Sequence, residues 1–166
     1  LFFLSGIQID SRGNINLHVI GDYQSPQVRL PGAYGSAMLY YMAHRVILSR
    51  TEHTKRTFVE KVDFVTAPGI TPANVHREGG PAKVITPKAM LAWDRQEGRW
   101  LLESVHPGSS AEEVRENTGF ELKAASSFRM TPPPTEKELS TLRTVVREKL
   151  RRIYPDFAEK KIKGQN

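Results

Sequence analysis

A glycine-rich loop that leads into an apolar segment is the first candidate for chemistry. The loop has the sequence Leu-Pro-Gly-Ala-Tyr-Gly-Ser-Ala over residues 30–37, and Ser36–Ala43 has the composition of a short buried helix. Backbone N–H groups at such a helix start lack an intrahelical acceptor, so they can face an anion or a developing oxyanion. The alternative is a tight turn whose small residues let the helix pack on a sheet. The residue pattern alone favours that alternative.

A second candidate is the polar run Thr51–Arg56, which contains Glu52 beside His53. It follows a predicted strand, Arg45–Ser49, at a place where α/β folds often carry functional loops. A glutamate beside a histidine could act as a base, an acid or an orienting pair. A solvated strand end, in which Glu52 pairs with a neighbouring Lys or Arg, is the alternative that the pattern favours.

Other signatures of catalysis are missing from the sequence. It has no phosphate loop with its Lys-Ser/Thr, no Gly-x-Ser-x-Gly elbow and no His-Glu-x-x-His motif. It also has no cysteine, which excludes disulfides, thiolate metal sites and cysteine nucleophiles. We expect structural or surface histidines and no metal site, because no ligand spacing joins the other histidines, His18, His44, His76 and His106.

Composition and charge fit one globular protein that binds no nucleic acid. A chain of 166 residues with 39% hydrophobic and 25% charged residues can form one compact domain. It lacks an apolar run of about 18 residues, so we expect a soluble protein that binds no membrane. The absence of cysteine fits a reducing compartment, so we expect the cytoplasm. Of the net charge of +6, residues 135–166 carry +4, from nine Lys or Arg less five Asp or Glu. This charge forms no basic stripe interleaved with aromatic residues, as nucleic-acid binding would require.

Strands dominate the predicted elements that must position the candidate residues. Alternating apolar residues on both sides of a Ser-Arg-Gly-Asn turn predict a hairpin over Gly6–Ile20, and Gly21–Gly35 is rich in loop residues. Further strands are predicted at Val62–Thr66 and, as two or three strands, within Lys83–His106. The sequence therefore predicts an α/β domain, and the pattern leaves open whether its sheet is parallel.

A short helix is predicted after Ser109 or Ser110, because a Glu follows each serine by three residues as in a capping box. Gly119 lies where a left-handed C-terminal cap would end that helix. Three prolines after Thr131 then break the chain.

Thr135 and Glu138 form another capping box, and apolar residues continue one helical face to about Tyr154, followed by a frayed end. We therefore expect an α/β domain over residues 1–134 and a basic C-terminal helix and tail over residues 135–166.

Short motifs follow one another along the chain to about Pro134. They are Gly6–Asp10, Gly13–Asn16, Val19–Tyr23, Val28–Gly32, Glu52–Arg56, Phe58–Phe64, Val84–Thr86, His106–Gly108 and Asn117–Phe120. In order and spacing the set resembles the coenzyme A transferases of the type represented by the B subunit of glutaconate CoA-transferase, which is similar to 3-oxoacid CoA-transferases.

The resemblance implies an open α/β sheet with flanking helices and a hetero-oligomer with an A (alpha) subunit of similar fold. It implies a subunit that moves CoA between an acyl-CoA and a carboxylic acid, with CoA as substrate and no tightly bound cofactor. In this family a glutamate carboxylate attacks the thioester, and an acyl-glutamyl anhydride and a glutamyl-CoA thioester form in turn. Backbone amides hold the oxyanion.

The resemblance also assigns roles within the glycine loop. In the family this loop supplies an oxyanion amide, which gives Gly35 that role and places Gly32, Ser36 and Ala37 beside the substrate. Tyr34 departs from the family, where a small residue is usual. Its ring could narrow the acyl pocket or alter the loop.

Glu52 and His53 belong to another family motif, and we expect them to contact substrate or CoA without Glu52 acting as the nucleophile. The nucleophilic glutamate of the family lies upstream of the hairpin that begins at Gly6, so we expect this chain to be the C-terminal part of a subunit. A related branch hydrolyses or ring-opens cyclic CoA thioesters in steroid breakdown, and a noncatalytic scaffold could keep the same fold. The residues do not separate these alternatives from a transferase.

Overall fold

The computed structural model describes residues 1–162, which divide into two compact units. Unit 1 comprises Leu1–Thr131, and unit 2 begins at Pro132. The elements of unit 1 are β1 (Phe2–Leu4), β2 (Gln8–Asp10), β3 (Ile15–Asn16), β4 (Val19–Gly21), β5 (Pro26–Arg29), α1 (Ser36–Met42), β6 (Val46–Ser49), β7 (Phe58–Val59), β8 (Pro81–Ile85), β9 (Ala89–Asp94), β10 (Arg99–Val105), α2 (Ala111–Glu116) and β11 (Lys123–Met130).

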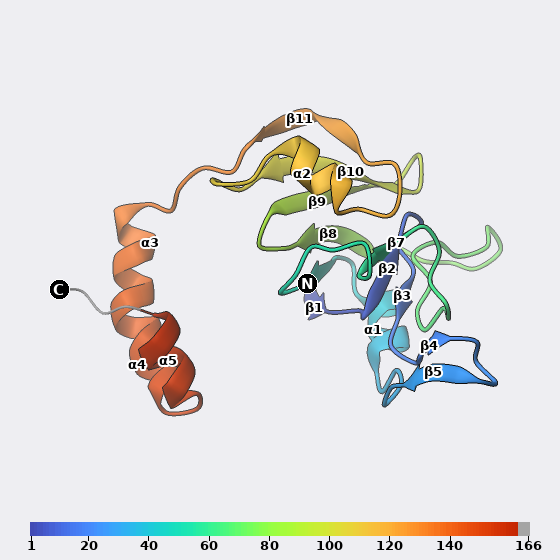
Figure 1. Ribbon diagram of the computed structural model, residues 1–166, viewed down its shortest axis with the longest axis horizontal. Helices are drawn as coiled ribbons and strands as arrows, with labels where there is room; N and C mark the ends of the chain where they lie inside the picture. The colour runs from blue at the N-terminus through green and yellow to red at the C-terminus, as the bar shows by residue number, and fades with distance from the viewer. Residues whose placement is uncertain (163–166) are drawn as a thin grey trace. The chain divides into compact units, whose positions relative to one another are not determined.

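A six-stranded sheet forms the centre of unit 1, with the strand order β1-β6-β8-β9-β10-β11 (Figure 1). Strand β6 pairs in parallel with both β1 and β8, whereas β9 runs antiparallel to its neighbours β8 and β10. The predicted α/β fold with an open sheet and flanking helices is confirmed, and the sheet is mixed. Strands β1, β6 and β8 therefore end at the same edge of the sheet.

One apolar core holds this sheet against a three-stranded sheet, β3-β2-β7, and against both helices. Two large buried side chains also carry hydrogen bonds across it. The indole N–H of Trp100 donates to the carbonyl of Asp10 (3.1 Å), and the hydroxyl of Tyr40 donates to the carbonyl of Gly13 (2.7 Å). Burial of each large apolar side chain contributes about 1.5–3 kcal/mol. These two residues therefore fix the hairpin turn to the sheet and to α1.

Several predicted elements are confirmed. Strands β2 and β3 form the predicted hairpin, with Ile9 opposite Ile15. Helix α1 and strand β6 lie where they were predicted, and the segment Lys83–His106 contains the three strands β8, β9 and β10. Helix α1 was expected to be buried, but Tyr40 is its one buried residue. Met38, Tyr41 and Met42 are exposed.

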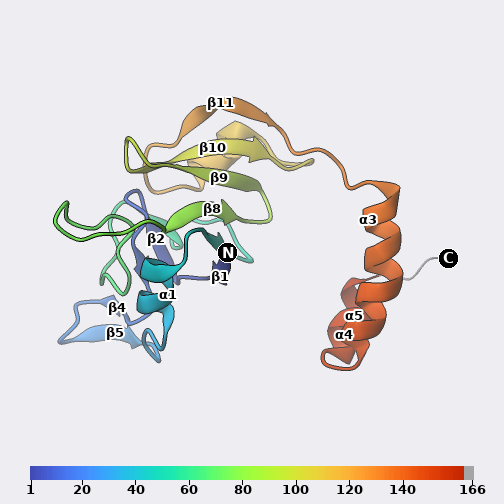
Figure 2. The same ribbon diagram turned by 180° about the vertical axis from the view of Figure 1, so that it is seen from behind.

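The predicted strand Val62–Thr66 is wrong. This stretch forms no ladder, because the backbone N–H groups of Val62 and Asp63 donate to the side chains of Asp10 (Oδ2, 3.4 Å) and Gln8 (Oε1, 3.0 Å). Strand β7 pairs with β2 instead. The stretch predicted to be loop-rich, Gly21–Gly35, contains β5, which pairs with β4 in a small ribbon beside α1 (Figures 1 and 2).

Helix α2 begins after Ser110, whose hydroxyl accepts the amide of Glu113 (3.1 Å) as predicted. The left-handed cap predicted at Gly119 is wrong, since Gly119 is not among the residues with positive φ. Gly119 is required by close packing instead. Its N–H donates to the carbonyl of Phe58 (2.7 Å), and a Cβ there would lie 2.4 Å from that oxygen.

Unit 2 is helical, with α3 (Glu136–Thr141), a π-helical turn η1 (Leu142–Val146), α4 (Arg147–Arg151) and α5 (Pro155–Lys161). The capping box between Thr135 and Glu138 is confirmed. The prediction of a frayed end after Tyr154 is wrong for the residues described there, up to Ile162. Helix α5 forms in this stretch, and its Glu159 pairs with Arg147 of α4 (2.6 Å). Within residues 1–162, no helix is long and apolar enough to cross a membrane.

Substitution of Gly119 by alanine will destabilise the fold by about 1–3 kcal/mol, because the new methyl group forces β7 away from the chain that follows α2. Gly35→Ala is the matched control, since Gly35 has φ −88° and its added Cβ would have no contact closer than 3.6 Å. We expect this control to change stability by less than about 0.5 kcal/mol. Urea unfolding measures both changes, and equal stability of the two variants would contradict the packing argument.

Candidate functional site

Two cavities lie at the carboxyl ends of the parallel strands β1 and β6, at the edge where open α/β sheets commonly bind ligands. The hydroxyl of Ser5, directly after β1, donates to the carbonyl of Ser49 at the end of β6 (2.9 Å) and keeps these ends together. The first, here the loop cavity, has a volume of about 420 Å³ and is bordered by Ile7, Gly32, Tyr34, Ser36 and Arg50 among others. The second, here the Glu52 cavity, has a volume of about 450 Å³ and also contacts Ile7 and Arg50.

The glycine loop leaves several backbone donors without an acceptor among the described residues, and the N–H of Gly35 is one of them. The N–H of Ser36 donates to the carbonyl of Ala33 (2.8 Å) and is therefore occupied. The N–H of Gly35, which directly precedes α1, meets no acceptor in the described part of the chain. Of these two amides, only that of Gly35 is available to a ligand. Of the residues that the sequence assigned to this loop, Gly32, Tyr34 and Ser36 line the cavity. Gly35 lies between two of them without lining it, and Ala37 does not line it either.

The turn itself depends on left-handed backbone at Gly32 (φ 98°) and at Tyr34 (φ 47°). Glycine adopts this conformation without strain, whereas a residue with a Cβ atom does so at a cost. The side chain of Tyr34 is 87% exposed, so packing gives it little compensation. The tyrosine therefore occupies a position at which the backbone geometry favours glycine.

Glu52 lies in the wall of the second cavity and is held as a carboxylate. Its Oε1 accepts from the hydroxyl of Thr57 (2.8 Å) and from Nη2 of Arg50 (3.1 Å), and its Oε2 lies 3.5 Å from Nη2 of Arg56. The hydrogen bond from Thr57 is the main cause that lowers the pKa of Glu52, and both arginines add to it. A carboxylate stabilised in this way is a poor proton acceptor. Its contacts fit the pairing of Glu52 with neighbouring arginines.

His53 points into the interior, away from both cavities. Its two ring nitrogens each lie 3.0 Å from a hydroxyl, Nδ1 from Thr86 and Nε2 from Thr118, and the ring stacks on Phe58. Burial lowers the pKa of His53 to about 4, so the imidazole is neutral near pH 7. His53 therefore lines neither cavity, and its contacts give it a structural role.

The other histidines also make local contacts. His18 Nδ1 lies 2.7 Å from the hydroxyl of Thr66, and His106 Nδ1 lies 2.8 Å from that of Thr131. Over residues 1–162, no three His, Asp or Glu side chains come together in a group that could hold a metal ion.

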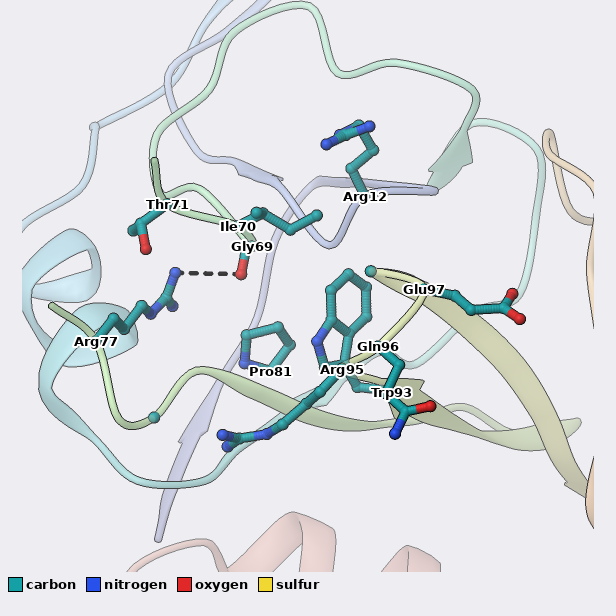
Figure 3. A pocket seen from close by; sticks show the side chains of 12 residues that line it. Arg12, Gly69, Ile70, Thr71, Arg77, Pro81, Trp93, Arg95, Gln96 and Glu97 are labelled. Carbon is teal, nitrogen blue, oxygen red and sulfur yellow. Dashed lines mark hydrogen bonds between the residues drawn. The ribbon is translucent and has the colours of Figure 1, made fainter. Parts of the chain in front are cut away.

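A third cavity, of about 380 Å³, is lined by Pro81 at the amino end of β8 and by the turn between β9 and β10 (Figure 3). Of the three arginines that line it, Arg77 and Arg95 donate to backbone carbonyls, although Nε of Arg77 is buried without a partner in the described part of the chain. Arg77 donates to the carbonyls of Pro68 (2.7 Å), Gly69 (3.2 Å) and Tyr40 (2.5 Å). Arg95 donates to those of Glu78 (2.9 Å) and His44 (3.3 Å). These arginines tie loops together, so the carboxyl-end cavities are better candidates for ligand binding.

Known proteins match this chain over most of its length. The sequence model of the coenzyme A transferase family matches residues 1–117. Over 149 residues the chain is 38% identical to the B subunit of 3-oxoadipate CoA-transferase from Pseudomonas knackmussii, in a match that covers 86% of this chain and 57% of its relative. Over 143 residues it is 31% identical to the cholesterol ring-cleaving hydrolase IpdB subunit of Rhodococcus jostii, in a match that covers 84% and 56%.

The fold also matches a solved structure. The crystal structure of glutaconate coenzyme A-transferase from Acidaminococcus fermentans superposes with a TM-score of 0.75 at 33% identity, over 87% of this chain and 57% of that chain. The present chain thus spans little more than half the length of the relatives it matches.

Acidification will weaken the fold through His53. In the unfolded chain the imidazole takes up a proton below about pH 6.5, whereas the folded ring stays neutral down to about pH 4. The stabilising contribution is therefore complete above the unfolded pKa and is lost as the pH falls toward the folded one, by about 2 kcal/mol between pH 7.5 and pH 5. Urea unfolding at both pH values measures this loss. An equally steep loss in His53→Gln would contradict the assignment.

Replacement of Tyr34 by glycine will not destabilise the protein, despite the loss of a large side chain. Relief of left-handed strain, worth roughly 1–2 kcal/mol, offsets the greater backbone entropy of unfolded glycine, worth roughly 0.5–1 kcal/mol. Tyr34→Val should instead destabilise it, because a β-branched residue tolerates positive φ least. Thermal unfolding of both variants checks the order. A valine variant as stable as the glycine variant would argue against backbone strain.

Proposed function

Because this chain belongs to the coenzyme A transferase family, we propose that it forms part of a B-type subunit that transfers CoA from an acyl-CoA to a carboxylic acid. The observation that carries the proposal is the N–H of Gly35, which has no acceptor in the described part of the chain and lies between Tyr34 and Ser36, two residues that line the loop cavity. Identity of 38% to a 3-oxoadipate CoA-transferase subunit supports the assignment of the reaction.

In the proposed reaction a glutamate carboxylate, supplied from outside these 166 residues, attacks the thioester carbonyl. The carbonyl oxygen then carries a negative charge, and the N–H of Gly35 donates a hydrogen bond to it. The C–S bond breaks, CoA leaves as a thiolate and an acyl-glutamyl anhydride remains. The thiolate attacks the glutamyl carbonyl and releases the carboxylic acid. A second carboxylate finally takes the CoA from the glutamyl-CoA thioester by the same two steps in reverse.

The exposed side of α1 supports a partner subunit. Met38, Tyr41 and Met42 lie on one face of the helix and are 61%, 41% and 66% exposed. Exposed apolar patches of this kind mark protein interfaces, in which methionine and aromatic residues are enriched. We assign this face to an A-type subunit, which together with the acyl-CoA and the carboxylic acid completes the proposed set of partners.

A hydrolase is the second candidate, and the 31% identity to a ring-cleaving hydrolase subunit is the observation that favours it. In that case water takes the place of the accepting carboxylate, while the same amide stabilises the oxyanion. A noncatalytic scaffold with the same fold is the third alternative.

The complete gene product, isolated with its partner subunit, distinguishes these functions. A transferase passes CoA to an added carboxylic acid, and without the acceptor its mass increases by that of thioester-bound CoA. Release of free CoA at a rate independent of the acceptor would establish the hydrolase. If neither reaction occurs over a panel of acyl-CoA substrates, the noncatalytic scaffold is the remaining alternative and the proposed function is overturned.

In that enzyme, Gly35→Val keeps the backbone N–H but its side chain will hold the carbonyl oxygen away from that donor. We therefore expect kcat to fall on the order of a hundredfold to a thousandfold, as when one oxyanion hydrogen bond is lost. The backbone at Gly35 accepts a side chain without strain, so the thermal midpoint should change little, and the loss comes from crowding of the carbonyl oxygen. Gly35→Ala, which adds a single methyl group, should retain more activity. Near-normal turnover in folded Gly35→Val would show that the loop is only a packing turn.

A further inference from the structure

Unit 2 exposes most of its large apolar side chains. Among residues 132–162 only Ala158 and Ile162 are buried, so these helices enclose a very small core of their own. The exposed ones, between 42% and 68% accessible, are Leu142, Val145, Ile153, Tyr154 and Phe157. Apolar surface of this kind commonly marks a protein interface. The function proposed above uses none of these residues, and the family model ends at residue 117.

One side of the long helix of unit 2 carries a defined row of side chains. The segments α3, η1 and α4 form one continuous helix, because the residues at their junctions, Leu142 and Arg147, have right-handed helical backbone. Arg147 points to the side where α5 lies beside α4 (Figures 1 and 2), and it donates to the carbonyl of Ile162 (3.0 Å). The opposite side, here the outer row, has residues spaced by three or four positions, namely Leu142, Val145, Lys149 and Arg152.

Ion pairs within unit 2 leave the outer row positively charged. Glu159 pairs with Arg147 (2.6 Å) and with Arg151 (2.9 Å), on the side of α5. Lys149 and Arg152 are exposed and make no ion pair with any described residue. Residues 132–162 contain eight Lys or Arg and five Asp or Glu, so their net charge is +3. The two apolar residues of the row are thus followed by two cations that lack a counter-ion.

This row fits a second helix that carries acidic residues. Helices that pair through one side contact each other at spacings of three and four residues, and charges beside the apolar contact select the partner. Such a partner brings apolar side chains to Leu142 and Val145 and carboxylates to Lys149 and Arg152. A second copy of unit 2 carries the same charge of +3 and is therefore repelled.

The turn between α4 and α5 favours a protein over a membrane as the occupant. Ile153, Tyr154 and Phe157 extend the apolar surface at this turn. Asp156 lies exposed among them, and an anionic membrane would repel its carboxylate. A helix that lies on a membrane also keeps its apolar side free of charge, whereas the outer row mixes apolar and basic residues.

We propose that unit 2 is a docking module that binds an acidic amphipathic helix of another protein. The outer row makes the central contact, and Ile153 extends it at the end nearest the turn. This interaction is independent of CoA transfer and of the α1 face assigned to the A-type subunit. It brings the enzyme together with a further protein without using the loop cavity.

A fluorescein-labelled peptide of about 18 residues tests this proposal, since shorter helices are marginal in water. Its leucines recur every three or four residues, and glutamates flank them. Anisotropy is measured with the complete gene product, isolated with its partner subunit, and micromolar binding is expected. Lys149→Glu combined with Arg152→Glu should weaken binding by at least about tenfold, because both ion pairs become repulsive. Val145→Asp should weaken it as well, through loss of the apolar contact.

Lys137→Glu combined with Lys161→Glu is the matched control. It makes the same change in net charge, both lysines are exposed without an ion pair to a described residue, and neither belongs to the outer row. This control should keep the wild-type Kd. A peptide with lysine in place of glutamate should bind the Lys149/Arg152 double variant more tightly than the wild type.

Three results would overturn the proposal. The first is equal binding of a scrambled peptide of the same composition, or an equal loss in the matched control, since either shows attraction by net charge alone. The second is binding to phosphatidylserine-containing vesicles in place of the peptide, which would assign the surface to a membrane. The third is absence of peptide binding to the wild type, or self-association that Val145→Asp abolishes, which would assign the row to a partner already bound.

Discussion

The parallel pairing of β1 with β6 is the constraint on which the rest of the site depends. Its register sets Leu4 opposite Leu48, so the chain leaves both strands at the same level. Ser5 and Arg50 then emerge side by side, and the loop cavity forms between these ends and the glycine loop. If β1 paired with β6 in a register shifted by one residue, Arg50 would move away from the glycine loop.

A buried hydrogen-bond set then fixes the loop after β6. His53 is held between Thr86 and Thr118, which belong to segments distant in sequence, and its neighbour Glu52 consequently lies at the surface beside the arginines. Neutral histidine between two hydroxyls satisfies both ring nitrogens, as a buried polar group requires. The core thus fixes His53, and the adjacent Glu52 lines the Glu52 cavity.

Local patterns predicted the elements whose pairing is itself local. The hairpin of β2 and β3, the strands β8 to β10 and the cap at Ser110 each carry their signal within a few residues. Gly119 was misinterpreted because its requirement comes from Phe58, far away in the sequence. Strand β5 was missed because it begins with a proline and carries one aliphatic side chain, Val28, and β7 was missed because it has two residues. The apolar pattern that follows β7 gave a false strand, because the backbone N–H groups of Val62 and Asp63 donate to side chains.

The candidate site was predictable only in part. The glycine loop has a recognisable sequence and belongs to a family motif, but a lone arginine after a strand has no local signature, so Arg50 emerges only from the tertiary structure. The central claim, that acyl-CoA binds at the carboxyl ends of β1 and β6, is tested most directly by NMR titration of the ¹⁵N-labelled chain with butyryl-CoA. The account predicts shifts of the Gly35 amide with an unchanged Trp93 indole signal. A shift of the Trp93 indole signal with an unchanged Gly35 amide would place the ligand in the third cavity, which Trp93 lines, and would contradict the claim.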